Sequence, residues 1–197
     1  MEGKFIIPYS EYAVIEHLTD LLKKRLNLKK RDDYYYSSYI PTSRQEKGID
    51  FLIYNSLTKK CSCFQVKSSR SYLSGTPGKK GQYEYNLWFN NFIKRYHRNK
   101  ADYYILFALY PLYSLVKSIN SKRYFWKNII LCIPDAEMKG LLDSVRTKKE
   151  KKPDAFFGIS FDEPPEKVFG IRGWESPIDL SQYLIDKQLD AIIQSMT

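Results

Sequence analysis

The sequence predicts an α/β protein in which a mixed β-sheet is flanked by helices. Its 197 residues are enough for one domain with a sizeable core and barely enough for two. Segments with helical and with strand periodicity follow one another as helix, three or four strands, helix, two strands and helix. This order contains no duplicated βαβ unit, and no internal repeat or low-complexity linker divides the chain. We therefore expect residues 1–197 to form a single domain.

The first helix is expected to run from about residues 9–11 to Leu26, with Ser10 as its N-cap. Its apolar stripe has spacings of three and four residues and consists of Ile15, Leu18, Leu22 and Leu26. Glu11 falls near the middle of the same arc when each residue advances by about 100°, whereas Glu16 falls almost on the opposite side. An acid at this end of the stripe is either a functional residue or a favourable charge at the positive helix N-terminus.

Two strands joined by a turn follow in GIDFLIYN and KCSCFQVKSS, between residues 48 and 69. If the turn centres between positions 57 and 58, residues whose numbers sum to 115 face each other across the hairpin. In this register Asp50 lies opposite Gln65, and Lys67 shares their face because side chains alternate along a strand. The hairpin therefore brings an acid, an amide and an amine together at one end.

The remaining segments complete the predicted sheet and its helices. A glycine- and lysine-rich loop over 74–81 separates the hairpin from the next extended piece. Two long apolar runs are interpreted as strands buried on both faces, and two later, shorter segments as edge strands. The extended pieces lie at 82–90, 101–111, 127–134, 155–162 and 167–173, and the helices at 90–99, at 135–145 with Asp135 as the cap, and from Ser176 and Pro177 onward. Trp88 and Phe89 are interpreted as core residues, with a base-stacking platform as the alternative.

The formal net charge of +10 is the most informative feature of the composition. Basic residues concentrate at 23–31, 94–100 and 146–152, and such clusters are either solvated surface or an electrostatic footprint for nucleic acid. The 17 tyrosines add stacking surfaces, although most of them belong in a core or in strands. The charge by itself thus leaves both interpretations open, a solvated surface and a nucleic-acid partner.

The sequence indicates an intracellular protein, which we expect in the cytoplasm. No apolar run approaches the length of a membrane span, and the N-terminal MEGKFIIPYSEY lacks the pattern of a signal peptide. Cys61 and Cys63 should point to the same face of one strand, a poor arrangement for a disulfide, and Cys132 lies far away in sequence. With 2 histidines and no CxxC pair, a structural zinc site is not expected.

The oxygen atoms of Asp50 and Gln65 should lie at cross-strand distance, an arrangement that suits a hard divalent cation such as Mg²⁺. Lys67 beside them can orient or help to deprotonate an attacking water and can stabilise charge that develops on a phosphate. The structural alternative is a cluster at the edge of the sheet, in which Asp50 pairs with Lys67 and Gln65 caps a loop. The residue types therefore allow metal-dependent hydrolysis of a phosphodiester.

The spacing of these residues resembles the PD-(D/E)xK nuclease superfamily, which includes many restriction endonucleases and Holliday-junction resolvases. The similarity rests on GID, on QVK after 14 intervening residues, and on a preceding helix that carries Glu11. It covers about residues 10–69 by motif and extends to about Pro134 by the order of elements. It is closest to the branch, with Mrr-like restriction nucleases, in which glutamine replaces the acid of the second half-motif. Ile49 stands where the motif has proline, and the neutral Gln65 is expected to bind a metal more weakly than an acid.

The resemblance implies a restriction-endonuclease-like fold and a Mg²⁺-dependent endonuclease that hydrolyses DNA phosphodiester bonds, with Mn²⁺ as a substitute metal. By position, Asp50, Gln65 and Glu11 would hold the metal and Lys67 would be the catalytic lysine. A homodimer would allow both DNA strands to be cut, in a restriction-type or DNA-processing reaction. The alternatives are a nuclease-fold DNA-binding module without cleavage and an RNA-processing nuclease.

Further residues near the motif are candidates for contact with DNA phosphates. Ser69 and Arg70 follow the catalytic lysine where the strand leaves the core, and the serine is also able to bond within a local turn. Lys79 and Lys80 lie in the glycine-rich loop, where they either clamp a nucleic-acid backbone or are simply solvated. Arg44, just before the first strand of the hairpin, is a peripheral candidate.

Overall fold

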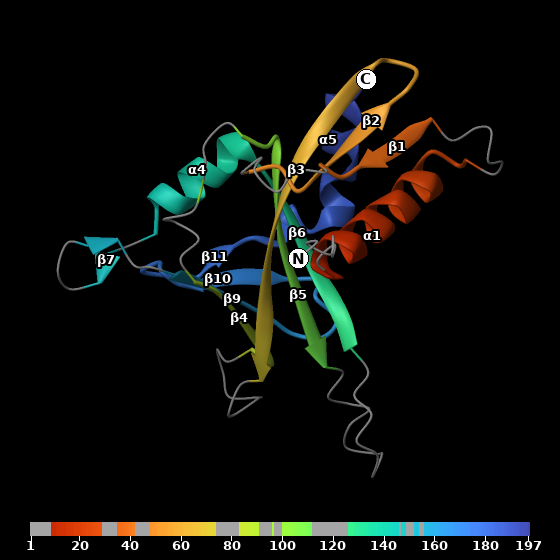
Figure 1. Ribbon diagram of the computed structural model, residues 1–197. Helices are drawn as coiled ribbons and strands as arrows, with labels where there is room; N and C mark the ends of the chain where they lie inside the picture. The colour runs from red at the N-terminus through yellow and green to blue at the C-terminus, as the bar shows by residue number, and fades with distance from the viewer. Residues whose placement is uncertain are drawn as a thin grey trace, which may run out of the picture.

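The computed structural model describes most of the chain and has the predicted α/β character, with helices flanking a mixed sheet (Figure 1). The described residues are 9–28, 35–41, 48–73, 83–90, 96, 100–111, 126–145, 147–148, 152–153 and 156–197. None of the helices in these ranges combines the length and the apolar character that crossing a membrane requires.

Helix α1 (Tyr9–Arg25) forms where the sequence predicts it, but its details differ in two ways. Ser10 lies inside the helix and is not its N-cap. The fully buried positions are Ala13, Val14, Leu18 and Leu22, so the buried stripe is centred closer to Val14 than to Ile15, which is only partly buried. Each fully buried aliphatic side chain stabilises the fold by about 2 kcal/mol, which is what holds this weakly amphipathic helix on the sheet. Asn27 has a positive φ of 51° and ends the helix in the left-handed conformation common after helix C-termini.

The sheet is built around strand β3, which is long enough to pair with different partners along its length. The strands are β1 (Tyr36–Tyr39), β2 (Phe51–Asn55), β3 (Lys60–Leu73), β4 (Tyr85–Asn90), β5 (Tyr103–Pro111), β6 (Trp126–Pro134), β9 (Phe156–Phe161), β10 (Val168–Arg172) and β11 (Ile178–Asp179). On one edge β3 pairs first with β2 and then with β4, both antiparallel, and on its other edge it runs parallel to β5. The sheet continues from β4 through β9 and β10 to β11, and from β5 to β6. Short strands β7 (Thr147–Lys148) and β8 (Lys152–Pro153) pair separately.

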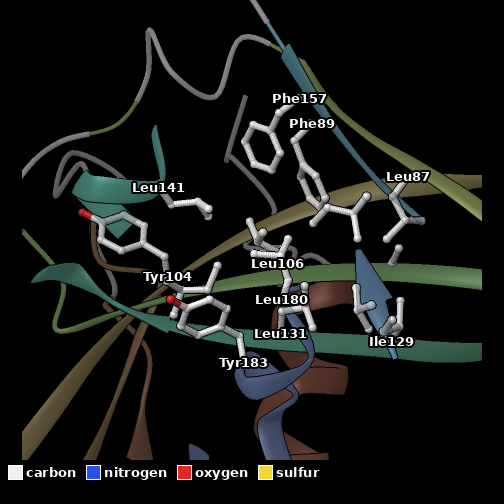
Figure 2. Packing of buried hydrophobic residues seen from close by; sticks show 14 of the residues in the cluster. Leu87, Phe89, Tyr104, Leu106, Ile129, Leu131, Leu141, Phe157, Leu180 and Tyr183 are labelled. Carbon is white, nitrogen blue, oxygen red and sulfur yellow. The ribbon is translucent and has the colours of Figure 1, made fainter. Parts of the chain in front are cut away.

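Two hydrophobic cores cover the two faces of β3, β5 and β6. Phe64 and Ile105 belong to the core beneath α1 and α5 (Ile185–Ser195), which lie on the same side of the sheet in Figure 1. Leu106 and Leu131 point the other way, into a core that includes α4 (Asp135–Asp143) and the inner face of β4, β9 and β10. Figure 2 shows this second core, in which Phe157 packs beside the stacked ring of Phe89. Strand residues therefore alternate between two interiors, as expected for strands buried on both faces.

The register predicted for the hairpin is confirmed. Phe51 pairs with Phe64 and Tyr54 with Cys61, so the numbers of paired residues sum to 115. Phe51 and Phe64 lie on the same face of the hairpin, and their stacked rings have centroids 4.8 Å apart. Because the residues on either side alternate, Gln65 and Lys67 face away from α1 and towards the core that contains Leu106, the ladder partner of Lys67.

Several predicted segments differ from the structure. The sequence predicts residues 155–162 at a sheet edge, but β9 lies between β4 and β10. The region after Ser176 forms β11 and the 3₁₀ turn η2 (Ser181–Tyr183), and α5 begins only at Ile185, because the Leu180 amide donates to the Val168 carbonyl and extends the sheet. Strand β1 has no counterpart among the predicted elements. Helix α4 is confirmed, although Asp135 is its first residue and not its cap, and the helix predicted over 90–99 lies largely outside the described residues.

Candidate functional site

The predicted site lies where the edge of β3 passes from one partner strand to the next. The described ladder with β2 ends at the pair Phe51 and Phe64, and the ladder with β4 begins only at the pair Ser71 and Leu87. The intervening stretch of β3 keeps β5 on its other edge but has no ladder partner on this one among the described residues. A diverging pair of strands of this kind leaves room for polar side chains and for a ligand at the fork.

Asp50 occupies this fork and extends the ladder with its side chain. Its amide donates to the Phe64 carbonyl at 2.8 Å, and its Oδ2 accepts a hydrogen bond from the Val66 amide at 2.6 Å. The carboxylate thus takes the acceptor position that a backbone carbonyl would hold in a continuing strand. Burial raises the pKa of Asp50, and the Val66 hydrogen bond and the positive charge of Lys67 oppose this shift without cancelling it. The structure therefore places Lys67 close enough to Asp50 for an electrostatic interaction.

Gln65 is the most unusual residue of the site because its amide is buried with an unused acceptor. The side chain is only 3% exposed, and its Oε1 has no hydrogen-bond partner among the described residues. A buried polar atom left in this state costs about 1–3 kcal/mol, so such atoms are rare unless a ligand or an ion satisfies them. Gln65 directly precedes Val66, whose amide binds the Asp50 carboxylate, so the unused oxygen belongs to the residue next to the one that holds Asp50.

Gly48 explains the glycine of the GID motif. It is buried, has a φ of +111°, and lies so close to Lys100 that a Cβ atom would stand 2.7 Å from the Lys100 Cβ and 3.9 Å from the Gln65 Nε2. A side chain here would be strained in φ and would collide with Lys100. Gly48 thus lets the chain pass beside Gln65 immediately before Asp50.

The residues present suit a hard divalent cation. A carboxylate and an amide oxygen are ligands that Mg²⁺ accepts, and Mg²⁺ usually completes its shell with waters and phosphate oxygens. Among the described residues no cluster of three histidine, cysteine, aspartate or glutamate side chains forms, so the chain offers no separate cage of anionic ligands there. Asp50 and Gln65 are therefore the residues of the hairpin whose oxygen atoms could hold such an ion.

Glu11 comes from helix α1 and not from the hairpin that carries the other three predicted residues. It is half-buried in the first turn of α1 and belongs to the helix side that also carries Val14 and Leu18. That side packs on the Phe64 face of the sheet, whereas Gln65 and Lys67 face the opposite core. The structure thus relates Asp50 to Lys67 by charge and to the backbone next to Gln65 by a hydrogen bond, and the roles of all four residues stay predictions.

The predicted DNA contacts are placed only in part. The Ser69 hydroxyl donates to the Trp88 carbonyl at 2.6 Å and so links β3 to β4, which gives this residue a structural role. The backbone of Arg70 continues β3 beside β5. Arg44, Lys79 and Lys80 lie outside the described residues.

The sequence predicts both Trp88 and Phe89 as core residues, but the structure separates them. Phe89 is 3% exposed in the core, whereas Trp88 is half-buried on the other face of β4, where the guanidinium of Arg172 lies over its ring. Strict alternation along β4 is the signal that could have shown the difference. Sequence reasoning misses Arg172, because 83 intervening residues separate it from Trp88.

The three cysteines of the chain form no disulfide. Cys61, Cys63 and Cys132 are all free, and Cys63 lies beside Lys100 and Asp102 in an open hollow of about 520 Å³. Burial raises the pKa of Cys63 to about 11, with the charge of Asp102 and the neighbouring Cys61 adding to the shift. Because the thiolate is the reactive form, this position does not favour a nucleophilic cysteine.

Comparison with known proteins adds a single structural similarity. No protein-family model and none of the curated proteins matches the chain. Among solved structures, the chain is similar to that of a bacterial homing endonuclease, I-Ssp6803I, with 16% sequence identity and a TM-score of 0.36. The similarity covers 79% of this chain and 86% of that chain. At this level of similarity nothing about the activity of the chain follows from that structure.

Proposed function

We propose that the protein is a Mg²⁺-dependent endonuclease that hydrolyses DNA phosphodiester bonds at the Asp50, Gln65 and Lys67 site. The observation that carries the proposal is the unused, buried Oε1 of Gln65, the residue that precedes Val66, whose amide binds the Asp50 carboxylate. A structural hairpin end would have no reason to hold an unsatisfied amide oxygen and a charged carboxylate together in a partly buried place. A bound cation would satisfy both atoms at once.

In this mechanism each side chain has a separate task. Asp50 supplies the negative charge that binds the metal, and the Val66 amide holds its carboxylate in a fixed orientation. Gln65 supplies a neutral oxygen ligand, and the Lys67 amine orients the attacking water and stabilises negative charge that develops on the phosphate. The bound metal would supply Lewis-acid stabilisation of the phosphate and of the leaving oxygen. Glu11 is proposed as an additional ligand.

The charge of the chain supports DNA as the substrate. A net charge of +10 attracts a polyanion and raises the rate of encounter with it. We propose a cytoplasmic enzyme that acts as a homodimer when both strands are cut. Substrate competition between DNA and RNA of the same sequence tests the choice of nucleic acid.

Incubation with plasmid DNA in Mg²⁺, Mn²⁺ or EDTA tests the proposal. Cleavage should require a divalent cation and should be abolished in Lys67→Ala and in Asp50→Asn. Lys60→Ala is the matched control, because it removes one exposed lysine from the same strand far from the fork. Wild-type cleavage by Lys67→Ala or Asp50→Asn would show that the activity does not arise at this site. Glu11→Gln, with the exposed Glu16→Gln as its control on the same helix, tests the additional ligand.

A DNA-binding module without cleavage is the second candidate, and the neutral ligand favours it. Gln65 adds no charge to the site, and the raised pKa of Asp50 shows that the carboxylate is not fully compensated by its neighbours. Calorimetric titration with Mg²⁺ in the presence and absence of a DNA duplex separates the two candidates. The nuclease should take up metal with DNA, whereas DNA binding by the module should not depend on Mg²⁺.

A further inference from the structure

A cation stacked on an aromatic ring stands out on the outer face of β4, β9 and β10. A Cβ atom on Gly158 would lie 2.4 Å from Cζ3 of Trp88 and 2.7 Å from its Cε3, so the indole lies against the bare backbone of β9. The guanidinium carbon of Arg172 lies 5.5 Å from the centre of the ring. Arg172 is also the ladder partner of Gly158 on β10. Three adjacent strands thus contribute a ring, the space for it and a cation.

This arrangement restricts the arginine in a way that suits an anionic ligand. A guanidinium packed against an aromatic face is held there by the cation–π interaction, and its N–H donors lie along the edge of the guanidinium plane. Because the side chain is already ordered, it loses less conformational entropy when it binds an anion. Arginine also matches the geometry of phosphate with two parallel donors.

The position of this pair relative to the proposed cleavage site is set by direct hydrogen bonds. The Trp88 amide donates to the Ser69 Oγ at 3.3 Å, and the same Oγ donates to the Trp88 carbonyl at 2.6 Å. Ser69 is two residues from Lys67 on β3. Leu87 and its partner Ser71 share the face of Lys67, so Trp88 lies on the opposite face. The pair therefore cannot bind the phosphate at Lys67, and any phosphate that it binds is a different one.

The same outer face also carries charged residues near Tyr83. Beyond the Trp88 position, the face continues to Phe169, on which Tyr83 stacks with ring centroids 5.2 Å apart. The pKa of Tyr83 is raised mainly by its partial burial, and the nearby charges of Asp162 and Asp179 add to the shift. Lys167 and Lys187 lie near Asp179, so this end of the face carries charges of both signs, and the attraction of a phosphate to the face rests on Arg172 itself.

We propose that Arg172, held by Trp88 over Gly158, is a phosphate clamp for DNA that flanks the cleaved bond. The clamp rests on the proposed function in one respect, namely that DNA is the ligand. It adds to the proposed site a second region of contact with DNA, which is joined to β3 by the two hydrogen bonds between Ser69 and Trp88. Its contribution is to affinity and not to the chemical step.

Binding of a DNA duplex in EDTA at several salt concentrations tests the clamp without cleavage. Arg172→Ala should weaken binding roughly tenfold, as expected for the loss of one charged hydrogen-bonded contact, and should reduce the slope of log K against log salt by about one. Lys60→Ala removes the same charge elsewhere and should change affinity less. Trp88→Leu and Gly158→Ala keep the charge but disturb the stack, and they should weaken binding about threefold through lost ordering of the arginine. Trp126→Leu, at an exposed tryptophan, is the control for the ring.

The outcomes separate the clamp from the nuclease proposal. Equal affinity and equal salt slope for Arg172→Ala and Lys60→Ala, in proteins with unchanged circular dichroism, would overturn the clamp. Arg172→Lys keeps the charge on a side chain that cannot stack in the same way, so it should restore the salt slope but only part of the affinity. If DNA binding depends on Arg172 but wild type cuts no DNA in Mg²⁺ or Mn²⁺, the clamp stands and the nuclease proposal fails. If Arg172→Ala cuts normally at saturating DNA and only its affinity falls, both stand.

Discussion

At the scale of single residues, the buried side-chain oxygen of Gln65 is the feature from which the prediction of metal binding follows. Its buried Oε1 has no partner in the described part of the chain, and the glutamine contributes no charge to balance a cation. An ion held by Asp50 and an amide should bind weakly alone and more tightly when phosphate oxygens complete its shell. Metal uptake is therefore expected to be coupled to DNA binding.

Substitutions at Gln65 test this coupling. Gln65→Glu restores a charge with nearly the same shape, so Mg²⁺ should bind more tightly and cleavage should be retained. Gln65→Leu should fold with an equal or higher free energy of unfolding, because it replaces an unsatisfied buried amide by apolar atoms, but it should not cut DNA. Calorimetric metal titrations of the three proteins, with and without a duplex, give the comparison. Cleavage by Gln65→Leu at the wild-type rate would make Gln65 a structural residue.

The raised pKa of Asp50 predicts that the free energy of unfolding depends on pH. Because its pKa is raised in the folded state, the folded protein holds this proton more tightly than the unfolded chain does. The stabilising contribution is thus complete below the unfolded pKa and is lost as the pH rises through the folded pKa. Asp50→Asn, which keeps an oxygen for the Val66 amide, should be more stable than wild type at pH 7, and the difference should shrink towards pH 3.5. Urea unfolding across this range without metal measures it, and a constant difference would contradict the assignment.

At the scale of elements, the β2–β3 hairpin carries the proposed site, and Gly48 lets the chain pass close to Gln65 where it enters the hairpin. Gly48 has a positive φ, and a Cβ atom at this position would collide with Lys100, so there is no room for a side chain. The same Cβ atom would lie 3.9 Å from the Gln65 Nε2. By contrast, a Cβ atom on Gly140 in α4 would have nothing within 4 Å of it. The two glycines therefore differ in what a methyl group would do.

Gly48→Ala should lower the free energy of unfolding by about 1–3 kcal/mol, the usual cost of strain in a sparsely populated backbone region, and should weaken metal-dependent activity by moving Gln65. Gly140→Ala should instead raise stability by roughly 0.5–1 kcal/mol, because alanine is favoured over glycine inside a helix. Urea titration of both variants provides the comparison. Loss of stability in both would point to a general intolerance of alanine and not to the geometry at Gly48.

At the scale of the whole molecule, the end of α5 is fastened to the turn of the site hairpin. Asn55 is 1% exposed, its Nδ2 donates to the Met196 carbonyl at 3.1 Å, and its Oδ1 accepts from the Leu57 amide at 2.9 Å. The same side chain thus shapes the β2–β3 turn and joins it to a helix more than a hundred residues later. On the surface, Arg25 of α1 and Asp190 of α5 form an ion pair at 2.7 Å, which adds little because both side chains are exposed.

Asn55→Ala should therefore cost about 1–3 kcal/mol of stability, since it leaves buried groups without partners. Arg25→Ala should change stability by less than about 1 kcal/mol, as is usual for exposed ion pairs. Thermal or urea unfolding of both variants measures the contrast. A larger loss for Arg25→Ala than for Asn55→Ala would reverse the assignment of the two contacts.

The site hairpin is predictable from the sequence because its contacts are local. The turn length and the alternation of Phe51, Ile53, Phe64 and Val66 specify one register, and a slip by one residue would expose all of them. That register predicts that Asp50, Gln65 and Lys67 lie at the same end of the hairpin. The mixed α/β character follows from periodicity in the same way, as do helix α1 and the buried strands β5 and β6.

Only the tertiary structure decided which distant segments meet. The internal position of β9, the strand β11 in place of a helical start, and the face on which Glu11 lies all depend on packing between segments far apart in the chain. Trp88 reaches Arg172 because β9 intervenes with a glycine, and no periodicity within either strand encodes that contact. The unsatisfied Gln65 oxygen is likewise a property of the folded state, because burial and partners exist only after the strands have assembled. Local alternation determined which side chains of the hairpin share a face, and long-range packing determined what surrounds them.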